Sequence, residues 1–330
     1  MEKPKIIILG NGNDWCELCL SDLSKYENTN IINSSLPCPQ KGVKSKLVKW
    51  HYSQTLAHWI NLPFKSIWYS YFADFISLDR EREIVIVIYD RHRLANNKSF
   101  LDYLRAYFKK VKLVYIFTNV MRISGASSNN FIDQLQKYYD AILSFDKGDE
   151  RRYGFKSIPL PYSENNVGLI EENSSVFFVG QAKDRLDTIL SIFQRLTKIG
   201  ESCEFYLTNV EEDKIRFEQD IIYNKRLKYQ DVIKHVQQAG CILDVIQGNS
   251  EGFTLKVCEA VFYDKLLITT NKAVKSAPFY DPRFVLVVEN AEDITKDFFL
   301  NRDKVKYSDD GKKYFSVESY LERILKAAGY

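Results

Sequence analysis

Short runs of apolar residues alternate with helical patterns along most of the chain. The run 84–88, Ile-Val-Ile-Val-Ile, has a β-branched residue at every position. This is typical of a parallel strand that helices cover on both faces. The pattern predicts strands at 5–9, 30–33, 84–89, 113–118 and 141–145 in the first half, and at 175–179, 204–207, 241–245, 266–270 and 285–288 in the second.

Helical periodicity fills the intervals between these strands. In the segment 99–110, Phe100, Leu101, Leu104 and Phe108 fall on one face. The same rule predicts helices at 185–199, 230–239, 254–263 and 316–328. Strands that alternate with helices form βαβ units, so we predict an α/β protein with two Rossmann-like, doubly wound domains. Ligands of such a pair bind in the central cleft that the domains face.

The clearest domain boundary follows the tripeptide Pro159-Leu160-Pro161, and a polar run begins at residue 163. Two closely spaced prolines before a polar segment are typical of a linker. We therefore predict an N-terminal domain at 1–162, a C-terminal domain at 163–315 and a terminal helix at 316–330. A chain of 330 residues is long enough for two separate cores.

Charge and cysteine content narrow the class of protein. The formal net charge of +3 is too small for the concentrated basic face of a nucleic-acid-binding protein, so we expect no nucleic-acid partner. The apolar run 6–9 is too short for a secretion signal, which favours a cytoplasmic protein. Cys16 and Cys19 form a C-x-x-C without a second pair at zinc-site spacing, so we expect reduced thiols and no metal.

The segment 248–261 holds the densest chemical pattern in the chain. Its sequence is Gly-Asn-Ser-Glu-Gly-Phe-Thr-Leu-Lys-Val-Cys-Glu-Ala-Val, between two predicted strands. It predicts a loop that opens a helix near Thr254, whose first backbone N–H groups attract an anion. Gly252 lets the backbone approach a ligand closely, and Glu259 offers a carboxylate to the two vicinal hydroxyls of a ribose.

Glu251 and Glu259 are separated by seven residues, and the segment resembles the E-x(7)-E signature of GT-B glycosyltransferases. The resemblance implies the GT-B fold, with Glu251 near the donor sugar and Glu259 on the nucleotide ribose. It also implies that Phe253, Thr254 and Leu255 present backbone groups to the diphosphate and the sugar. The alternative is a chance pair of glutamates on a solvated helix face.

A strand, a glycine turn and a helix start follow one another at 177–185. This segment is similar to the first strand of the GT-B donor domain, which implies that its basic residues reach the diphosphate. The candidates are Gly180, Lys183 and Arg185. Cations here would neutralise the departing nucleoside diphosphate, so we expect a metal-independent reaction and no cofactor beyond the nucleotide-sugar substrate. The alternative is that both cations are ordinary surface charges.

Asp90 and His92 follow the strand 84–89, at the end where a cleft is expected. With Glu251 they form the candidate catalytic set. A reaction that inverts the anomeric carbon needs a general base, and Asp90 is the leading candidate. A retaining reaction can use the donor's own phosphate oxygen, and the resemblance favours retention without deciding it. A lone histidine is more often structural than catalytic, so a structural role is the alternative for His92.

Basic and aromatic residues are mixed over residues 41–75. One interpretation is a peripheral contact with the inner face of a membrane, which would suit a lipid-linked acceptor. The other is a helical hairpin whose aromatic residues form core. These residues are Lys41, Lys44, Lys46, Lys49 and Lys65 with Trp50, Tyr52, Trp59, Trp68, Tyr69, Tyr71 and Phe72.

These observations favour a hexosyltransferase that moves a sugar, UDP-linked by expectation, to a glycan or lipid-linked acceptor. The stretch 139–146 together with 156–162 resembles bacterial surface-polysaccharide transferases of the capsule and O-antigen kind, which implies that pathway. Two alternatives stay open. One is another GT-B enzyme, such as a UDP-sugar epimerase, and the other is a non-catalytic GT-B scaffold.

Overall fold

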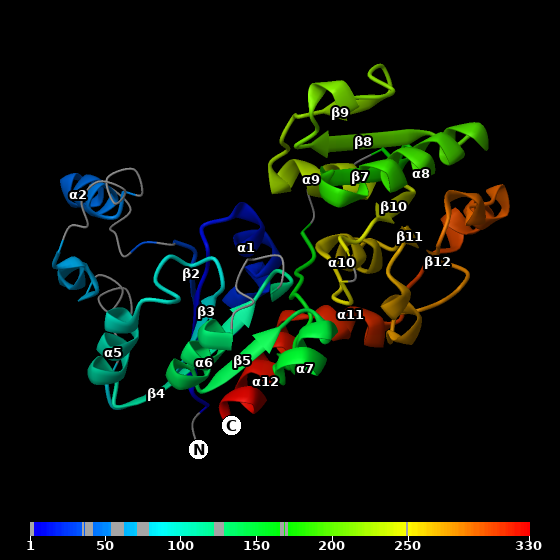
Figure 1. The fold of residues 1–330 in the computed structure, drawn as a ribbon. Coiled ribbons are helices and arrows are strands. Elements are labelled where there is room, and N and C mark those ends of the chain that lie inside the picture. The colour runs from blue at the N-terminus through cyan, green and yellow to red at the C-terminus, as the bar shows by residue number, and fades with distance from the viewer. Residues whose placement is uncertain are drawn as a thin grey trace.

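The computed structural model describes residues 3–34, 36, 42–53, 63–70, 79–121, 129–165, 168, 171–248 and 250–330. These residues form two six-stranded sheets, each covered by helices (Figure 1). All the strand pairs in both sheets are parallel. The two domains lie side by side, and the chain passes from one to the other after β6.

The first sheet has the strand order β2-β1-β3-β4-β5-β6. Its strands are β1 (Lys5–Leu9), β2 (Thr29–Ile32), β3 (Glu83–Tyr89), β4 (Lys110–Phe117), β5 (Ala141–Ser144) and β6 (Lys156–Ser157). Its helices are α1 (Asp14–Cys19), α2 (Val43–His51), α5 (Lys98–Tyr107), α6 (Asn129–Tyr138) and α7 (Lys147–Tyr153).

The central strand β3 is buried on both faces because its β-branched side chains alternate between two apolar clusters. Ile84, Ile86 and Ile88 lie in the cluster that α5 covers. Val85 and Val87 lie in a second cluster, on the opposite face. The period of two and the lack of any polar position explain why the sequence pattern identified this strand.

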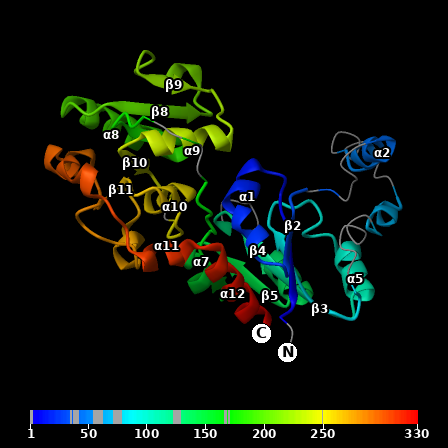
Figure 2. The same cartoon turned by 180° about the vertical axis from the view of Figure 1, so that it is seen from behind.

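The last helix, α12 (Val317–Ala328), returns to the first sheet (Figures 1 and 2). Tyr320 and Ile324 are buried in the same cluster as Ile6 and Val85. The hydroxyls of Tyr320 and Tyr89 lie 3.0 Å apart. The chain therefore crosses between the domains twice. The proposed domain limits at 162 and 315 stay predictions, but the helix at the second limit packs against the N-terminal sheet.

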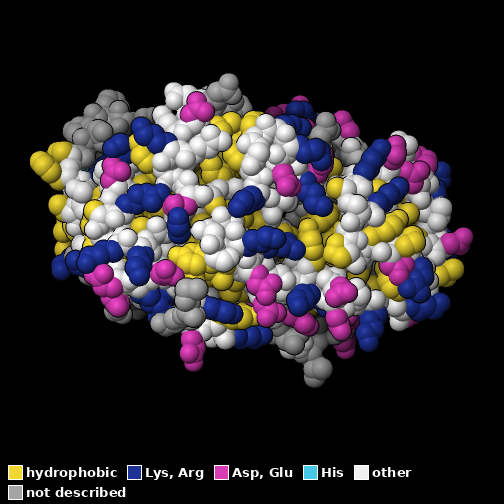
Figure 3. All heavy atoms as spheres, turned by 90° about the horizontal axis from the view of Figure 1, so that it is seen from below, with side chains coloured by type: hydrophobic (Ala, Val, Ile, Leu, Met, Phe, Trp, Pro, Cys, Tyr) yellow, Lys and Arg dark blue, Asp and Glu magenta, His cyan; other side chains and the backbone are white. Residues whose placement is uncertain are grey.

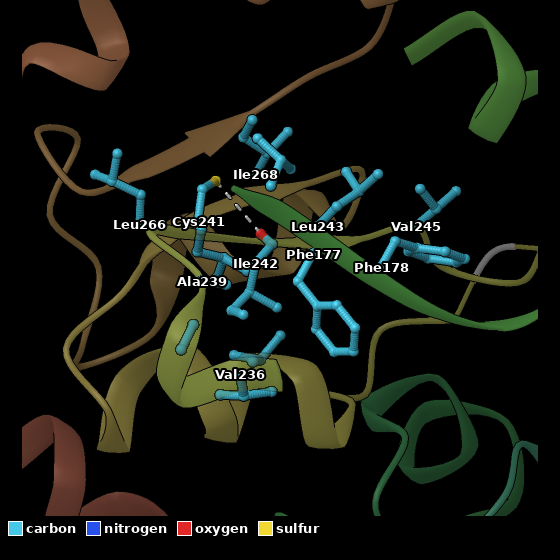
Figure 4. Packing of buried hydrophobic residues seen from close by; sticks show 14 of the residues in the cluster. Phe177, Phe178, Val236, Ala239, Cys241, Ile242, Leu243, Val245, Leu266 and Ile268 are labelled. Atoms are coloured by element: carbon cyan, nitrogen blue, oxygen red, sulfur yellow. Dashed lines mark hydrogen bonds between the residues drawn. The ribbon is translucent and has the colours of Figure 1, made fainter. Parts of the chain in front are cut away.

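The second sheet has the strand order β12-β11-β10-β7-β8-β9. Its strands are β7 (Val176–Gln181), β8 (Cys203–Thr208), β9 (Ile221–Tyr223), β10 (Cys241–Asp244), β11 (Leu266–Thr269) and β12 (Val285–Val287). Its helices are α8 (Leu186–Lys198), α9 (Tyr229–Gln238), α10 (Leu255–Phe262) and α11 (Asp309–Phe315). Figure 4 shows the core between β7, β10 and α9, where Phe177, Ile242 and Val236 pack together.

Short 3-10 helices complete the described elements. They are η1 (Ser21–Lys25), η2 (Lys65–Trp68), η4 (Lys183–Arg185), η5 (Glu212–Lys214), η6 (Lys272–Ser276), η7 (Ala291–Asp293) and η8 (Lys296–Lys304). No helix within the described ranges is both long enough and apolar enough to cross a bilayer. Basic and acidic side chains are interspersed over the face seen from below (Figure 3).

All the strands expected from the sequence are present, and no strand end differs from its predicted position by more than three residues. The short strands β6 and β9 were not predicted. The helix expected at 99–110 ends earlier, at Tyr107, because Phe108 has an extended backbone and β4 begins at Lys110. The cysteines within the described ranges, Cys16 and Cys19 among them, are free thiols; Cys38 lies outside those ranges.

Candidate functional site

The strand order reverses between β1 and β3 in the first sheet and between β7 and β10 in the second. Open α/β sheets bind ligands at such reversals, beyond the carboxyl ends of the strands. Here the two reversals border one cavity of about 330 Å³. Asn11 and Arg91 follow β1 and β3 on one side of it. Arg185, Gln247 and Lys256 line it on the other.

A larger cavity of about 800 Å³ adjoins the first, because Arg185, Ile246 and Ser250 line both. Its wall also includes Glu251 and, from the N-terminal domain, Arg151. Together the two cavities form a continuous cleft between the domains. Among the described residues, no group of three or more His, Cys, Asp or Glu side chains is arranged to hold a metal ion.

Arg185 is fixed at the carboxyl end of β7. Its guanidinium donates to the carbonyl oxygens of Gln181, at 3.0 Å, and of Val245. Burial lowers the pKa of Arg185. A Cβ atom at Gly180 would lie 3.3 Å from Arg185 Nη2 and 3.4 Å from the Phe178 ring, so a glycine there leaves room for the guanidinium. Gly180 therefore supports the site without lining it.

Lys183 is more exposed than Arg185 and has a positive φ of 49°. Its Nζ donates to Gln247 Oε1 at 2.6 Å. Burial lowers its pKa, and Arg185 and Arg91 lower it further, which places three cations around one part of the cleft. Such a cluster of like charges is costly unless an anion lies between them.

Lys256 is a further cation at this place, which the sequence analysis did not single out. It lies in the first turn of α10, with its Nζ 5.3 Å from the centre of the Phe178 ring. Burial lowers its pKa, with a further contribution from Arg185. It makes no hydrogen bond or ion pair with any other residue that the structure describes. Its ammonium group is thus available to a ligand.

The N-terminus of α10 lies on the same side of the cleft. Thr254 and Leu255 line the smaller cavity, and the first N–H groups of a helix have no partner within the helix. Thr254 Oγ1 donates to Asp244 Oδ1 at 2.9 Å, which fixes the start of the helix against β10. The side chain of Phe253 is buried in the core against Phe279, so that residue can offer a ligand only its backbone.

The loop before α10 is held by the N-terminal domain. Asp146 is buried after β5, and its Oδ2 accepts from Ser250 Oγ at 2.8 Å and from the Glu251 N–H at 3.0 Å. The Glu251 carboxylate forms an ion pair with Arg151 of α7. Glu251 also lines the larger cavity. Its role beside the donor sugar stays a prediction.

A glycine is required at position 252 for a different reason from the one that the sequence suggested. A Cβ atom there would lie 2.5 Å from the Phe145 ring and 2.8 Å from the Phe145 carbonyl oxygen. The close approach is thus to the N-terminal domain, and Gly252 is absent from the lining of both cavities. The Gly252 carbonyl accepts from Asn271 Nδ2 at 2.9 Å, which ties the loop to the end of β11.

Glu259 is buried in α10, with its side chain toward the domain boundary. Tyr229 Oη donates to Glu259 Oε1 at 2.8 Å, and Cys19 Sγ lies 3.4 Å from that hydroxyl. The Tyr229 N–H donates to Asp14 Oδ2 at 2.7 Å. Burial raises the pKa of Glu259. Glu259 is in the lining of neither cavity. Its role on a ribose stays a prediction, and it requires Tyr229 and the residues around it to move.

Asp90 follows β3 and is itself in the lining of neither cavity. Its Oδ1 accepts from Thr118 Oγ1 at 2.7 Å and from the Thr118 N–H at 3.2 Å. Its Oδ2 is buried without a hydrogen-bond partner among the described residues, and burial raises the pKa of the carboxyl group. The neighbours Arg91 and Thr118 line the smaller cavity. An unpaired carboxylate oxygen of raised basicity suits a general base.

His92 differs from Asp90 in its surroundings. It is 3% exposed, and Nε2 lies 3.1 Å from the carbonyl oxygen of Ser34 while Nδ1 accepts from the Leu94 N–H. Burial lowers the pKa of His92 to about 4. Both ring nitrogens are engaged with the backbone, and neither cavity includes the residue. The geometry does not support a catalytic role for His92.

Comparisons with known proteins address the fold. Neither a family model nor a curated sequence matches the chain. An alpha-glucosyltransferase solved with UDP-glucose and DNA containing an abasic site is similar, at 12% identity and TM-score 0.55, over 98% of this chain and 95% of that one. A glycosyltransferase involved in avilamycin A biosynthesis is similar at 10% identity and TM-score 0.55, over 99% and 97% of the chains. The protein therefore has the GT-B fold: two Rossmann-like domains that face a central cleft.

Proposed function

We propose that the protein is a glycosyltransferase that moves a sugar from a nucleotide-sugar donor, UDP-linked, to an acceptor hydroxyl. The observation that carries this proposal is the group of cations at the switch point of the second sheet. Arg185 and Lys256 line the smaller cavity there, beside the N-terminus of α10. Lys183 is in the lining of neither cavity but lies next to them, with its Nζ bonded to Gln247 of that lining. A nucleoside diphosphate has the charge and the size to lie among them.

The chemistry follows from this arrangement. The acceptor hydroxyl attacks the anomeric carbon, and the bond from that carbon to the diphosphate oxygen breaks with its electron pair leaving on the diphosphate. The cations and the helix N-terminus stabilise this developing charge, so we propose that the reaction needs no metal. The hydroxyl proton goes to Asp90 in an inverting reaction, or to a donor phosphate oxygen in a retaining one.

The nature of the acceptor is supported by fewer observations than the nature of the donor. We propose a glycan or a lipid-linked oligosaccharide of bacterial surface-polysaccharide synthesis, and this part rests on the sequence resemblance alone. The exposed cleft between the domains is compatible with an extended acceptor, because the larger cavity measures about 800 Å³. Nucleic acid as an acceptor is left to experiment, since it was excluded only on the net charge of +3.

Calorimetric titration with UDP and with GDP, without added metal, tests the donor site. We expect UDP to bind, and binding of neither nucleotide would refute the proposal. A panel of UDP-sugars is then incubated with protein, with and without acceptor glycans, and the products are separated by mass and by anomeric configuration. Transfer or slow donor hydrolysis supports a transferase. Conversion of one UDP-sugar into its epimer indicates an epimerase, and UDP binding without any turnover indicates a scaffold.

A further inference from the structure

A long acid-free stretch of the chain surrounds α2. Residues 28–73 contain no Asp or Glu, but they include five lysines. The chain as a whole has nearly balanced charges, with 46 basic and 43 acidic side chains. Three of these lysines, Lys44, Lys46 and Lys49, belong to α2, which lies at the outer edge of the N-terminal domain in both ribbon views (Figures 1 and 2).

The helix α2 turns apolar side chains outward. Ser45 and Val48 are buried against the domain. Val43, Leu47 and Trp50, spaced four and three residues apart, form an outer stripe that is 74%, 47% and 55% exposed. Lys44, Lys46 and Lys49 are exposed on the same helix. An outward apolar stripe among lysines reverses the usual pattern of a surface helix, which presents polar residues to water.

The short helix η2 extends this surface. Phe64 is 76% exposed and Ile67 is 58% exposed. Hydrogen bonds join the segment to α2: His51 Nε2 donates to the Pro63 carbonyl oxygen at 2.9 Å, and Trp68 Nε1 donates to His51 Nδ1 at 2.7 Å. The two elements thus form one platform, which we call the α2–η2 surface (Val43, Leu47, Trp50, Phe64 and Ile67 with the lysines of both segments).

The clustering of these apolar side chains is specific to this surface. Nine large apolar side chains are exposed in the described part of the chain, and five of them belong to the α2–η2 surface. Tyr52 and Tyr69 from the same stretch are buried, so the aromatic residues divide between core and surface. Lys41, Trp59, Tyr71 and Phe72, which the sequence analysis also named, lie outside the described residues.

We propose that the α2–η2 surface docks the protein on an anionic lipid bilayer. Lysines are attracted to acidic headgroups, while Trp50, Leu47 and Phe64 enter the boundary between headgroups and acyl chains. A nucleic-acid backbone would use the lysines but leave the exposed aliphatic side chains in water, so a lipid surface fits both halves of the pattern. The inference is independent of the proposed chemistry, since docking needs no donor.

Vesicle co-sedimentation of the full chain tests this inference. The vesicles are phosphatidylcholine alone, or phosphatidylcholine with phosphatidylglycerol. We expect binding to the anionic vesicles that is at least about tenfold stronger than to the neutral ones and that weakens with salt. The double variants Leu47→Ser/Trp50→Ser and Lys46→Gln/Lys49→Gln should each reduce binding at least about tenfold. These side chains are exposed, so the melting temperature should not change.

Matched controls carry the same changes elsewhere. Leu300→Ser, at a position 71% exposed, and Lys198→Gln on α8 should leave vesicle binding unchanged. Each variant is also titrated with UDP, which should bind as in the wild type. No binding of wild type to anionic vesicles, or equal binding by the α2 variants, would overturn the proposal. So would tighter binding to duplex DNA than to vesicles, or an α2-dependent dimer in sedimentation velocity.

Discussion

Replacement of Lys256 by Met separates ligand binding from fold stability. The ammonium group lies beside Arg185 over the Phe178 ring and has no described hydrogen-bond partner, so its charge is left for a ligand. A hydrogen bond to a charged group contributes about 1.5–3 kcal/mol, which corresponds to an affinity change of about ten- to a hundredfold. We expect the UDP dissociation constant of Lys256→Met to rise by that factor, while the affinity for uridine, which lacks the diphosphate, stays the same.

The same variant should bind UDP more weakly but should be at least as stable as the wild type. Burial lowers the folded-state pKa of Lys256, so the charged form destabilises the folded protein at any pH below that pKa. Met removes this penalty and keeps the apolar stem, and the melting temperature at pH 7 should be equal or higher. Both properties are measured by calorimetry, with Lys198→Met as the control at an exposed site of the same domain. UDP affinity within twofold of wild type would refute the placement of Lys256 at the diphosphate.

Three further predictions concern residues around the cleft. Glu259→Gln should weaken UDP binding at least about tenfold. Burial raises the folded-state pKa of Glu259, so the variant should also melt higher than wild type at pH 7; in a pH series of thermal scans the difference should shrink as the pH falls through that raised pKa and be lost below the ordinary glutamate pKa of 4.5. Asp90→Asn should reduce kcat by about a hundredfold or more with UDP affinity retained if Asp90 is the base, and an unchanged kcat would favour proton transfer to the donor phosphate. Gly252→Ala should destabilise the fold by about 1–3 kcal/mol in denaturant unfolding, because its Cβ meets Phe145; an unaltered midpoint would contradict that contact.

The sequence predicted the elements whose signals are local. The strand 84–89 was identifiable because β-branched residues occupy one position after another, and α8 because its apolar residues repeat at helical spacing. The strand β9 was missed because it has only three residues and leaves Ile222 exposed, so it lacks both the length and the pattern of a buried strand. Its pairing with β8, and not its own composition, makes it a strand.

Part of the cleft lining was predictable from the sequence, whereas Lys256 and the contacts between the two domains were not. Arg185, Thr254 and Glu251 line the two cavities: Arg185 lies shortly beyond the end of β7, Thr254 immediately precedes α10, and Glu251 lies in the loop between β10 and α10. The contact of Asp146 with Ser250 joins positions 104 residues apart, and no local pattern pairs them. For Gly252 the sequence predicted a close approach to a ligand, whereas the structure shows a close approach to Phe145. Only the packing of the two domains shows that Phe145 occupies that space.

The return of α12 to the first sheet has a consequence for how the protein is made. During synthesis the strands β1 to β6 leave the ribosome first, but α12, which covers Ile6 and Val85, is translated only after the whole second sheet. Domains usually fold in the order of their synthesis. In this chain one face of the N-terminal sheet is covered only in part, by Cys16, Leu20 and Leu23, until α12 emerges, so the second sheet can complete its core first. A nascent-chain protease assay should find the N-terminal half sensitive until residues 317–328 have been released.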